Sequence, residues 1–100
     1  MLATDPDADR VGIAVKTKNG YQLLNGNETG VLMENYIFSL RKKTDKTPVF
    51  VKTIVTSDMS GDIAKAYGAE VKEVLTGFKY IGETIDQLTS DDQYVFGMEE

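Results

Sequence analysis

Segments with strand character alternate with segments of helical periodicity along this chain, and that order restricts the folds open to it. The segments predicted to be strands are 11–16, 21–24, 48–55, 70–75 and 94–96. The segments predicted to be helices are 31–40, 58–67 and 78–88. Strands that alternate with helices favour a sheet with parallel members and helices on its faces. The sequence therefore predicts an α/β fold, a three-layer α/β/α arrangement with a mixed, partly parallel sheet of about four to five strands.

Turn and capping residues support several of these boundaries. Asn19-Gly20 is typical of a type I′ hairpin turn, so the segment after it is expected to return antiparallel to the strand before it. Ser57 can cap the start of a helix and Gly68 can end it. The Asn-Glu-Thr sequence at 27–29 is interpreted as the entrance to the first helix.

Composition excludes several kinds of site. The chain has no histidine and no cysteine, which excludes disulfide scaffolds, zinc sites built on thiolate or imidazole, cysteine nucleophiles and His-dependent triads. Lys and Arg number 11 against 16 Asp and Glu, a net charge of −5, so no nucleic acid partner is expected. Catalytic chemistry must therefore come from carboxylates, hydroxyls, Lys, Arg, Tyr or a bound hard cation.

The sequence predicts no membrane partner and no secretory signal. The longest apolar stretches, such as residues 11–15, are far shorter than the roughly 20 residues that span a bilayer. The N-terminus lacks the basic, apolar and small-residue regions of a signal peptide. An acidic chain without cysteine fits the cytosol, and we expect a cytoplasmic protein.

Polar turns follow three of the predicted strands, at 56–58, 76–79 and 97–100. In sheets with parallel strands, ligands bind outside the carboxyl ends of the strands. Because all three turns fall on this rim, we expect a site there.

The N-terminal segment carries Asp5, Asp7 and Asp9 at alternate positions, followed by Arg10. On a strand such carboxylates lie about 6.6 Å apart per step, whereas two oxygens on one Mg²⁺ lie at most about 4.2 Å apart. Shared binding of one ion therefore requires a curled loop. A calcium EF-hand is excluded, because its sixth position would be Arg10 rather than Gly and its twelfth Lys16 rather than Glu. Two interpretations stay open: an acidic surface turn, or a cation site that also handles phosphate, which Arg10 favours.

Four short sequence segments, taken in their order along the chain, indicate a family resemblance. They are Thr-Asp-Pro-Asp-Ala-Asp-Arg at 4–10, Gly-Asn-Glu-Thr-Gly at 26–30, Thr-Gly-Phe-Lys-Tyr-Ile-Gly at 76–82 and Phe-Gly-Met-Glu-Glu at 96–100. With these segments, which extend over essentially the whole chain, the sequence resembles the α-D-phosphohexomutases, the phosphoglucomutase/phosphomannomutase family.

The resemblance implies a fragment of a larger enzyme whose four domains surround a central cleft. Residues 1–12 would end the preceding domain and carry the metal-binding loop. Residues 13–100 would be the third domain, α/β/α, truncated at the sugar-binding loop. The phosphorylated catalytic serine would lie upstream, so the fragment would be inactive alone and would work with the other domains of the same chain.

By the same resemblance, Asp5, Asp7 and Asp9 would be the ligands of a Mg²⁺ cofactor. Arg10 would be a catalytic group that positions or neutralises phosphate.

The resemblance also implies a set of substrate-binding residues. Glu99 would bind sugar hydroxyls, and Glu100 is its neighbour in the same motif. Thr76 and Gly77 would belong to a loop near the sugar, although these two residues suit a plain turn as well. Lys79 would be a phosphate contact or a proton-transfer group, against the alternative of an exposed lysine after a strand.

The implied reaction is intramolecular phosphotransfer on a hexose phosphate, through an enzyme phosphoserine and a sugar bisphosphate intermediate. The Thr-Gly-Phe-Lys sequence at 76–79 and the Phe-Gly-Met-Glu-Glu sequence at 96–100 resemble those of phosphoglucomutases more closely. The resemblance therefore favours phosphoglucomutase, which interconverts glucose 1-phosphate and glucose 6-phosphate. The alternatives are phosphomannomutase, or a non-catalytic acidic α/β module that binds a metal or a partner.

Overall fold

A computed structural model describes residues 1–100 and shows nine elements of secondary structure. The strands are β1 (Leu2–Thr4), β2 (Val11–Thr17), β3 (Gly20–Leu24), β4 (Thr47–Thr53), β5 (Glu70–Val74) and β6 (Asp92–Met98). The helices are α1 (Gly26–Leu40), α2 (Asp58–Ala66) and α3 (Phe78–Asp86). The predicted alternation of strands and helices is confirmed.

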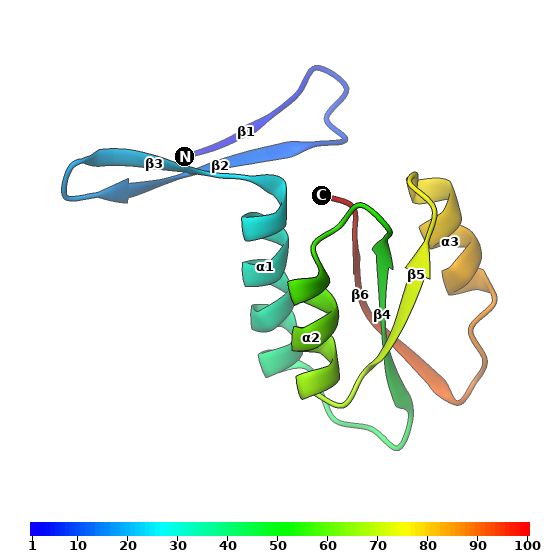
Figure 1. The fold of residues 1–100 in the computed structure, drawn as a ribbon. Helices are drawn as coiled ribbons and strands as arrows, with labels where there is room; N and C mark the ends of the chain where they lie inside the picture. The colour runs from blue at the N-terminus through cyan, green and yellow to red at the C-terminus, as the bar shows by residue number, and fades with distance from the viewer.

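The parallel strands form a sheet with the order β5-β4-β6. Helices α1 and α2 lie on one face of this sheet and α3 lies on the other, which gives the predicted three layers (Figure 1). Since β4 is central and covered on both faces, its side chains are buried alternately in two clusters. Phe50 packs with Phe38 and Ala64 under α1 and α2, whereas Val49 and Val51 pack with Ile81 of α3.

The remaining strands form a separate antiparallel sheet with the order β1-β2-β3, which projects from the three-layer body (Figure 1). The Asn19-Gly20 turn joins β2 to β3, as predicted, with Thr17 opposite Gly20. The chain therefore has two sheets of three strands rather than one mixed sheet of four to five. Strand β2 pairs with β1 on one side and β3 on the other, so it has no edge left for the parallel strands.

The expected boundary between residues 12 and 13 lies inside β2, which continues from Val11 to Thr17. The antiparallel sheet ends at Leu24, and the first residue of α1 is Gly26. None of the three helices has the length and apolar character needed to cross a membrane.

Helix α1 begins five residues before the predicted position because Asn25 caps it. The Asn25 side chain accepts a hydrogen bond from the backbone N–H of Glu28 at 2.9 Å, and the Glu28 carboxylate accepts one from the backbone N–H of Asn25 at 2.9 Å. This reciprocal pair is a capping box. It places the first turn of α1 beside the carboxyl ends of the parallel strands (Figure 1).

Helix α1 buries one carboxyl group in the core. Glu34 is fully buried, and neither of its side-chain oxygens has a hydrogen-bond partner. It lies one helical turn from Gly30, which packs against Met98, and one turn from Phe38, which packs against Phe50. Desolvation by these apolar surroundings raises the pKa of Glu34 to about 8.

Candidate functional site

The acidic segment forms a tight loop between β1 and β2. The Ala8 N–H donates to the Asp5 carbonyl at 3.0 Å, and the Asp5 N–H donates to the Arg10 carbonyl at 3.3 Å. Ala8 has a φ of 57°, in the left-handed region, which lets the chain reverse within four residues. The curled loop that ion binding requires is therefore the conformation that the segment adopts.

Asp5 is held in place inside this loop. Its Oδ1 accepts hydrogen bonds from the backbone N–H groups of Asp9 at 3.2 Å and Arg10 at 3.3 Å, and its Oδ2 pairs with Arg10 Nε at 2.9 Å. Partial burial works to raise the pKa of Asp5, but these hydrogen bonds and the Arg10 charge outweigh it and hold that pKa below its usual value of 3.8. The same pairing raises the pKa of Arg10.

The three aspartates converge. One carboxylate oxygen from each of Asp5, Asp7 and Asp9 lies within 4.8 Å of the other two. Asp5 is half-buried and the other two are exposed. Three carboxylate oxygens are the kind of donor set that hard divalent cations prefer, and their spacing of up to 4.8 Å is close to the roughly 4.2 Å that two oxygens on one Mg²⁺ can span. The residues present therefore fit such an ion.

A cleft of about 650 Å³ lies beside this loop. It is lined by the end of the acidic loop, the first turns of α1, the start of α3 and the end of β6. The lining includes Asp9, Arg10, Gly26, Thr29, Gly30, Met33, Gly77, Phe78, Phe96, Glu99 and Glu100. The loop thus faces the carboxyl ends of the parallel strands, the rim where a site is expected (Figure 1).

Two of the predicted polar turns meet at this rim. The Glu99 carboxylate accepts a hydrogen bond from the backbone N–H of Gly77 through Oε2 at 2.8 Å, which leaves Oε1 free to accept another. Gly77 has a φ of 125°, a conformation that side chains disfavour, so glycine suits this turn. Glu100 is exposed at the same rim, and Thr76 is exposed outside the cleft lining.

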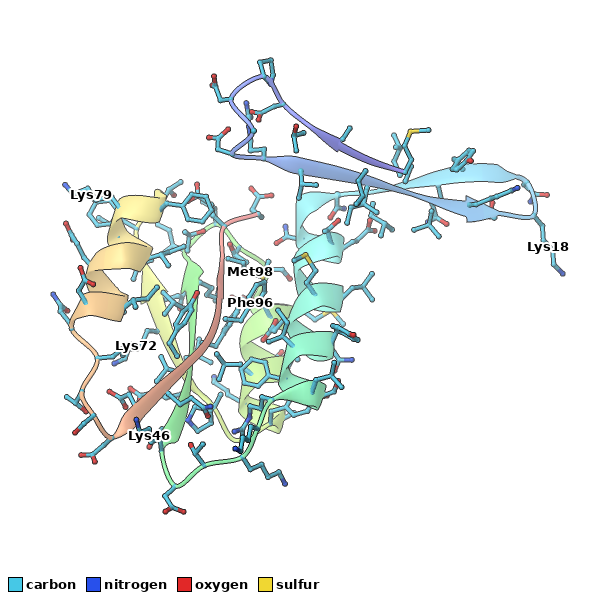
Figure 2. All side chains as sticks on the ribbon, turned by 180° about the vertical axis from the view of Figure 1, so that it is seen from behind. Lys18, Lys46, Lys72, Lys79, Phe96 and Met98 are labelled. Carbon is cyan, nitrogen blue, oxygen red and sulfur yellow. The ribbon has the colours of Figure 1, made fainter.

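Lys79 lies apart from these groups. It is exposed on α3, and its Nζ lies 5.4 Å from the centroid of the Tyr80 ring. Figure 2 shows its side chain directed away from the body of the molecule. Lys79 does not line the cleft, so the structure brings Asp9, Arg10, Gly77 and Glu99 together and places this lysine outside them.

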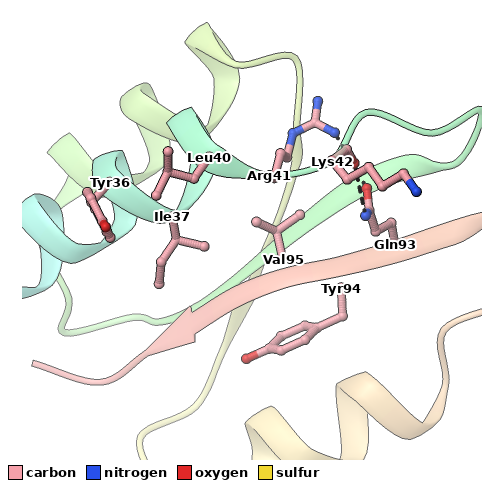
Figure 3. A pocket seen from close by; sticks show the side chains of 8 residues that line it. All are labelled: Tyr36, Ile37, Leu40, Arg41, Lys42, Gln93, Tyr94 and Val95. Atoms are coloured by element: carbon pink, nitrogen blue, oxygen red, sulfur yellow. Dashed lines mark hydrogen bonds between the residues drawn. The ribbon is translucent and has the colours of Figure 1, made fainter.

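A second groove, of about 380 Å³, lies at the opposite end of α1 (Figure 3). Gln93 occupies its polar side: the Gln93 amide oxygen accepts from Arg41 at 3.4 Å, and its NH₂ donates to the Lys42 carbonyl at 3.4 Å. These polar groups already satisfy each other, and the rest of the lining is largely apolar. The acidic cleft is therefore the stronger candidate for a functional site.

Residues 25–100 match the family described as "Phosphoglucomutase/phosphomannomutase, alpha/beta/alpha domain III". The chain belongs to the phosphoglucomutase/phosphomannomutase family. It is 41% identical over 100 residues to a phosphomannomutase of Mycoplasma genitalium and 38% identical over 101 residues to a phosphoglucomutase of Staphylococcus aureus. It is also 38% identical to a phosphomannomutase of Mycoplasmoides pirum. Each match covers 100% of this chain but only 18% of the relative.

The family match begins at residue 25, where the antiparallel sheet has ended, whereas the matches to the relatives include the acidic loop as well. The chain therefore joins an α/β/α domain of a phosphohexomutase to the segment that precedes it. That junction forms the cleft, since the acidic loop comes from one part and Glu99 from the other.

Sequence reasoning missed part of the cleft lining. Thr29 lies in the segment interpreted as a helix entrance, and no sequence motif singles out Met33, yet both residues line the cleft. The signal that could have located them is the capping box of Asn25 and Glu28, because it fixes where α1 starts and therefore which of its residues face the rim.

Proposed function

We propose that this chain is part of a phosphoglucomutase that interconverts glucose 1-phosphate and glucose 6-phosphate through an enzyme phosphoserine and a sugar bisphosphate. The observation that carries the proposal is the shared cleft, into which the acidic loop brings Asp9 and Arg10 while the segment after β6 brings Glu99. Phosphoryl transfer depends on positioning and on stabilisation of charge, and carboxylates, a guanidinium and a hard cation supply both.

In this proposal Asp5, Asp7 and Asp9 hold Mg²⁺. When bound, the ion would act as a Lewis acid that offsets negative charge on the phosphoryl group. Arg10 adds a permanent positive charge at the cleft, and its guanidinium has donors beyond the Nε that pairs with Asp5, so it can hold a phosphate as well.

Glu99 and its neighbours recognise the sugar. The free Oε1 of Glu99 can accept a hydrogen bond from a sugar hydroxyl while Oε2 stays bound to the Gly77 N–H. Glu100 lines the same cleft, and Thr76, which is exposed next to Gly77 and outside the cleft lining, would extend the binding surface beyond it. Lys79 is proposed as a phosphate contact or proton-transfer group, a role that requires its side chain to turn from the Tyr80 ring towards the cleft.

The relatives bear the names of two activities, and phosphomannomutase is therefore the second candidate. Because the chain spans 18% of those relatives, we propose that the phosphorylated serine and the remaining cleft residues come from outside residues 1–100, and that these residues are inactive alone. The lack of cysteine fits the reducing cytosol, and we place the protein there.

The test is turnover by the full-length protein that contains this chain. Purified protein is given glucose 1-phosphate or mannose 1-phosphate with Mg²⁺, and the 6-phosphate is measured by ³¹P NMR. We expect both conversions to be measurable, with a higher kcat/KM for the glucose substrate. A higher value for mannose 1-phosphate makes the enzyme a phosphomannomutase. Turnover of neither substrate, by protein shown to be phosphorylated on serine, would favour the non-catalytic binding module.

A further inference from the structure

The segment that carries Glu99 lies beyond the last ladder hydrogen bonds of the parallel sheet, since β6 ends at Met98. A side chain that selects a sugar by one or two hydrogen bonds needs a backbone held to a fraction of an ångström. The Glu99 side chain is fixed at Gly77, but the backbone that follows it requires an anchor of its own.

That anchor is Thr56, in the turn between β4 and α2. The backbone N–H of Glu100 donates a hydrogen bond to Thr56 Oγ1 at 3.3 Å. Thr56 Oγ1 also lies 2.9 Å from Thr53 Oγ1, in a second hydrogen bond. Thr56 is only 3% exposed and Thr53 is fully buried, so both hydroxyls lack water as an alternative partner.

A buried lysine holds Thr56 in turn. Lys52 Nζ donates to the Thr56 carbonyl at 2.9 Å, and Lys52 is only 2% exposed. The Lys52 Nζ also forms ion pairs with the carboxylates of Asp58, at 3.5 Å, and Glu73, at 3.4 Å. The turn is therefore connected through Lys52 to the buried central strand β4, and through the ion pairs of Lys52 to α2 and β5.

The opposite side of Glu100 is closed by α1. A Cβ built on Gly26 would lie 2.8 Å from the carbonyl carbon of Glu100, so the two backbones are in close contact. Glu100 is thus held between Thr56 and the first turn of α1, and a shift in either would move the backbone next to Glu99.

We propose that Thr56 is a positioning residue of the substrate site: its hydroxyl anchors the Glu100 backbone and thereby sets the position of the Glu99 carboxylate. This inference rests on the proposed function, because Glu99 is taken to bind the substrate. Thr56 itself does not line the cleft and acts only through Glu100 and Glu99.

The test compares Thr56→Val, Thr56→Ser and Thr84→Val in the full-length protein. Valine keeps the shape of threonine without the hydroxyl, and serine restores the hydroxyl. Thr84 is the matched control, since its Oγ1 donates to the Tyr80 carbonyl at 2.9 Å on α3, away from the cleft. We expect Thr56→Val to raise KM for the hexose phosphate about tenfold, a change equivalent to about 1.4 kcal/mol, with kcat changed less than twofold. Thr56→Ser should recover KM to within about threefold, and Thr84→Val should leave it unchanged.

Hydrogen exchange provides a second readout that does not depend on turnover. The Glu100 amide should exchange at least tenfold faster in Thr56→Val than in the wild type or Thr84→Val. Unchanged KM and unchanged exchange in Thr56→Val would overturn the inference and leave the proposed function intact. Equal increases of KM in Thr56→Val and Thr84→Val would show a loss of stability in place of positioning and would also overturn it. A wild-type protein without mutase turnover would instead refute the proposed function, and the role of Thr56 at the substrate site with it.

Discussion

Replacing Glu34 by methionine should stabilise the protein and remove a pH dependence from its unfolding. Glu34 is fully buried with two unpartnered oxygens between Gly30 and Phe38 on the packed face of α1. Methionine has a similar length, no charge and a flexible side chain that fills irregular space, so it can occupy the same volume. The substitution therefore changes the ionisation of this site more than its packing.

The size of the expected stabilisation follows from the pKa of Glu34, which is about 8 in the folded chain against an ordinary value of 4.5. Below pH 4.5 the Glu34 carboxyl is protonated in both the folded and the unfolded chain, so it costs no stability. As the pH rises from 4.5 towards 8, the carboxyl ionises first in the unfolded chain, and the free energy of unfolding therefore falls. At pH 7 the interval above 4.5 is about 2.5 pH units, and at 1.36 kcal/mol per unit the cost is at most about 3 kcal/mol. The loss levels off above about pH 8.

Urea unfolding of the wild type and of Glu34→Met, at intervals from pH 4.5 to 8.5, measures this cost as the difference between the two free energies of unfolding. Taking the difference cancels the other titrating groups. We expect the variant to gain up to about 3 kcal/mol on the wild type between pH 4.5 and 7. Glu83→Met, at an exposed position on α3, is the control and should show no such trend. A difference that stays constant with pH would show that the Glu34 carboxyl is solvated or paired, and would refute the reasoning.

Gly97→Ala and Gly30→Ala should change the free energy of unfolding by different amounts, because the new Cβ meets different atoms at the two positions. In Gly97→Ala the new Cβ would lie 3.2 Å from the Val51 carbonyl oxygen and 2.9 Å from the Tyr94 hydroxyl, so urea unfolding should show a loss of about 1–3 kcal/mol. In Gly30→Ala the obstacle is the flexible end of Met98, and the gain of up to about 1 kcal/mol in helix propensity offsets the repacking, so the same assay should show a change within about 1 kcal/mol. Equal losses in the two variants would contradict this explanation.

Much of the fold could be predicted because local patterns and tertiary structure agree. Asn19-Gly20 forms the expected hairpin turn, and Ser57 caps α2 by accepting a hydrogen bond from the Met59 N–H at 3.2 Å. The central strand β4 has the apolar run, Val49 to Val51, that is typical of a strand covered on both faces. Residues 2–4 were not predicted as a strand, because β1 is too short to show a period and exists through its pairing with β2.

The candidate site was predictable only as far as chain order determines it. The position of loops at the carboxyl ends of parallel strands predicts the meeting of Gly77 with Glu99, which the structure contains. The side chains of α1 that line the cleft depend on the helix start, which the apolar periodicity alone placed too late. The direction of Lys79 and the burial of Glu34 depend on packing between distant elements, which no local pattern records.

Substitution of one aspartate in the acidic loop tests the central claim most directly. Asp7→Asn removes one charged oxygen from the converging set, and Asp45→Asn is the control at an exposed position outside it. In the full-length protein we expect Asp7→Asn to lower kcat/KM for glucose 1-phosphate at least about 100-fold and to weaken Mg²⁺ binding by calorimetry, since Lewis-acid stabilisation contributes several kcal/mol. Asp45→Asn should match the wild type in both measurements. Wild-type turnover and Mg²⁺ affinity in Asp7→Asn would contradict the assignment of this loop to the site.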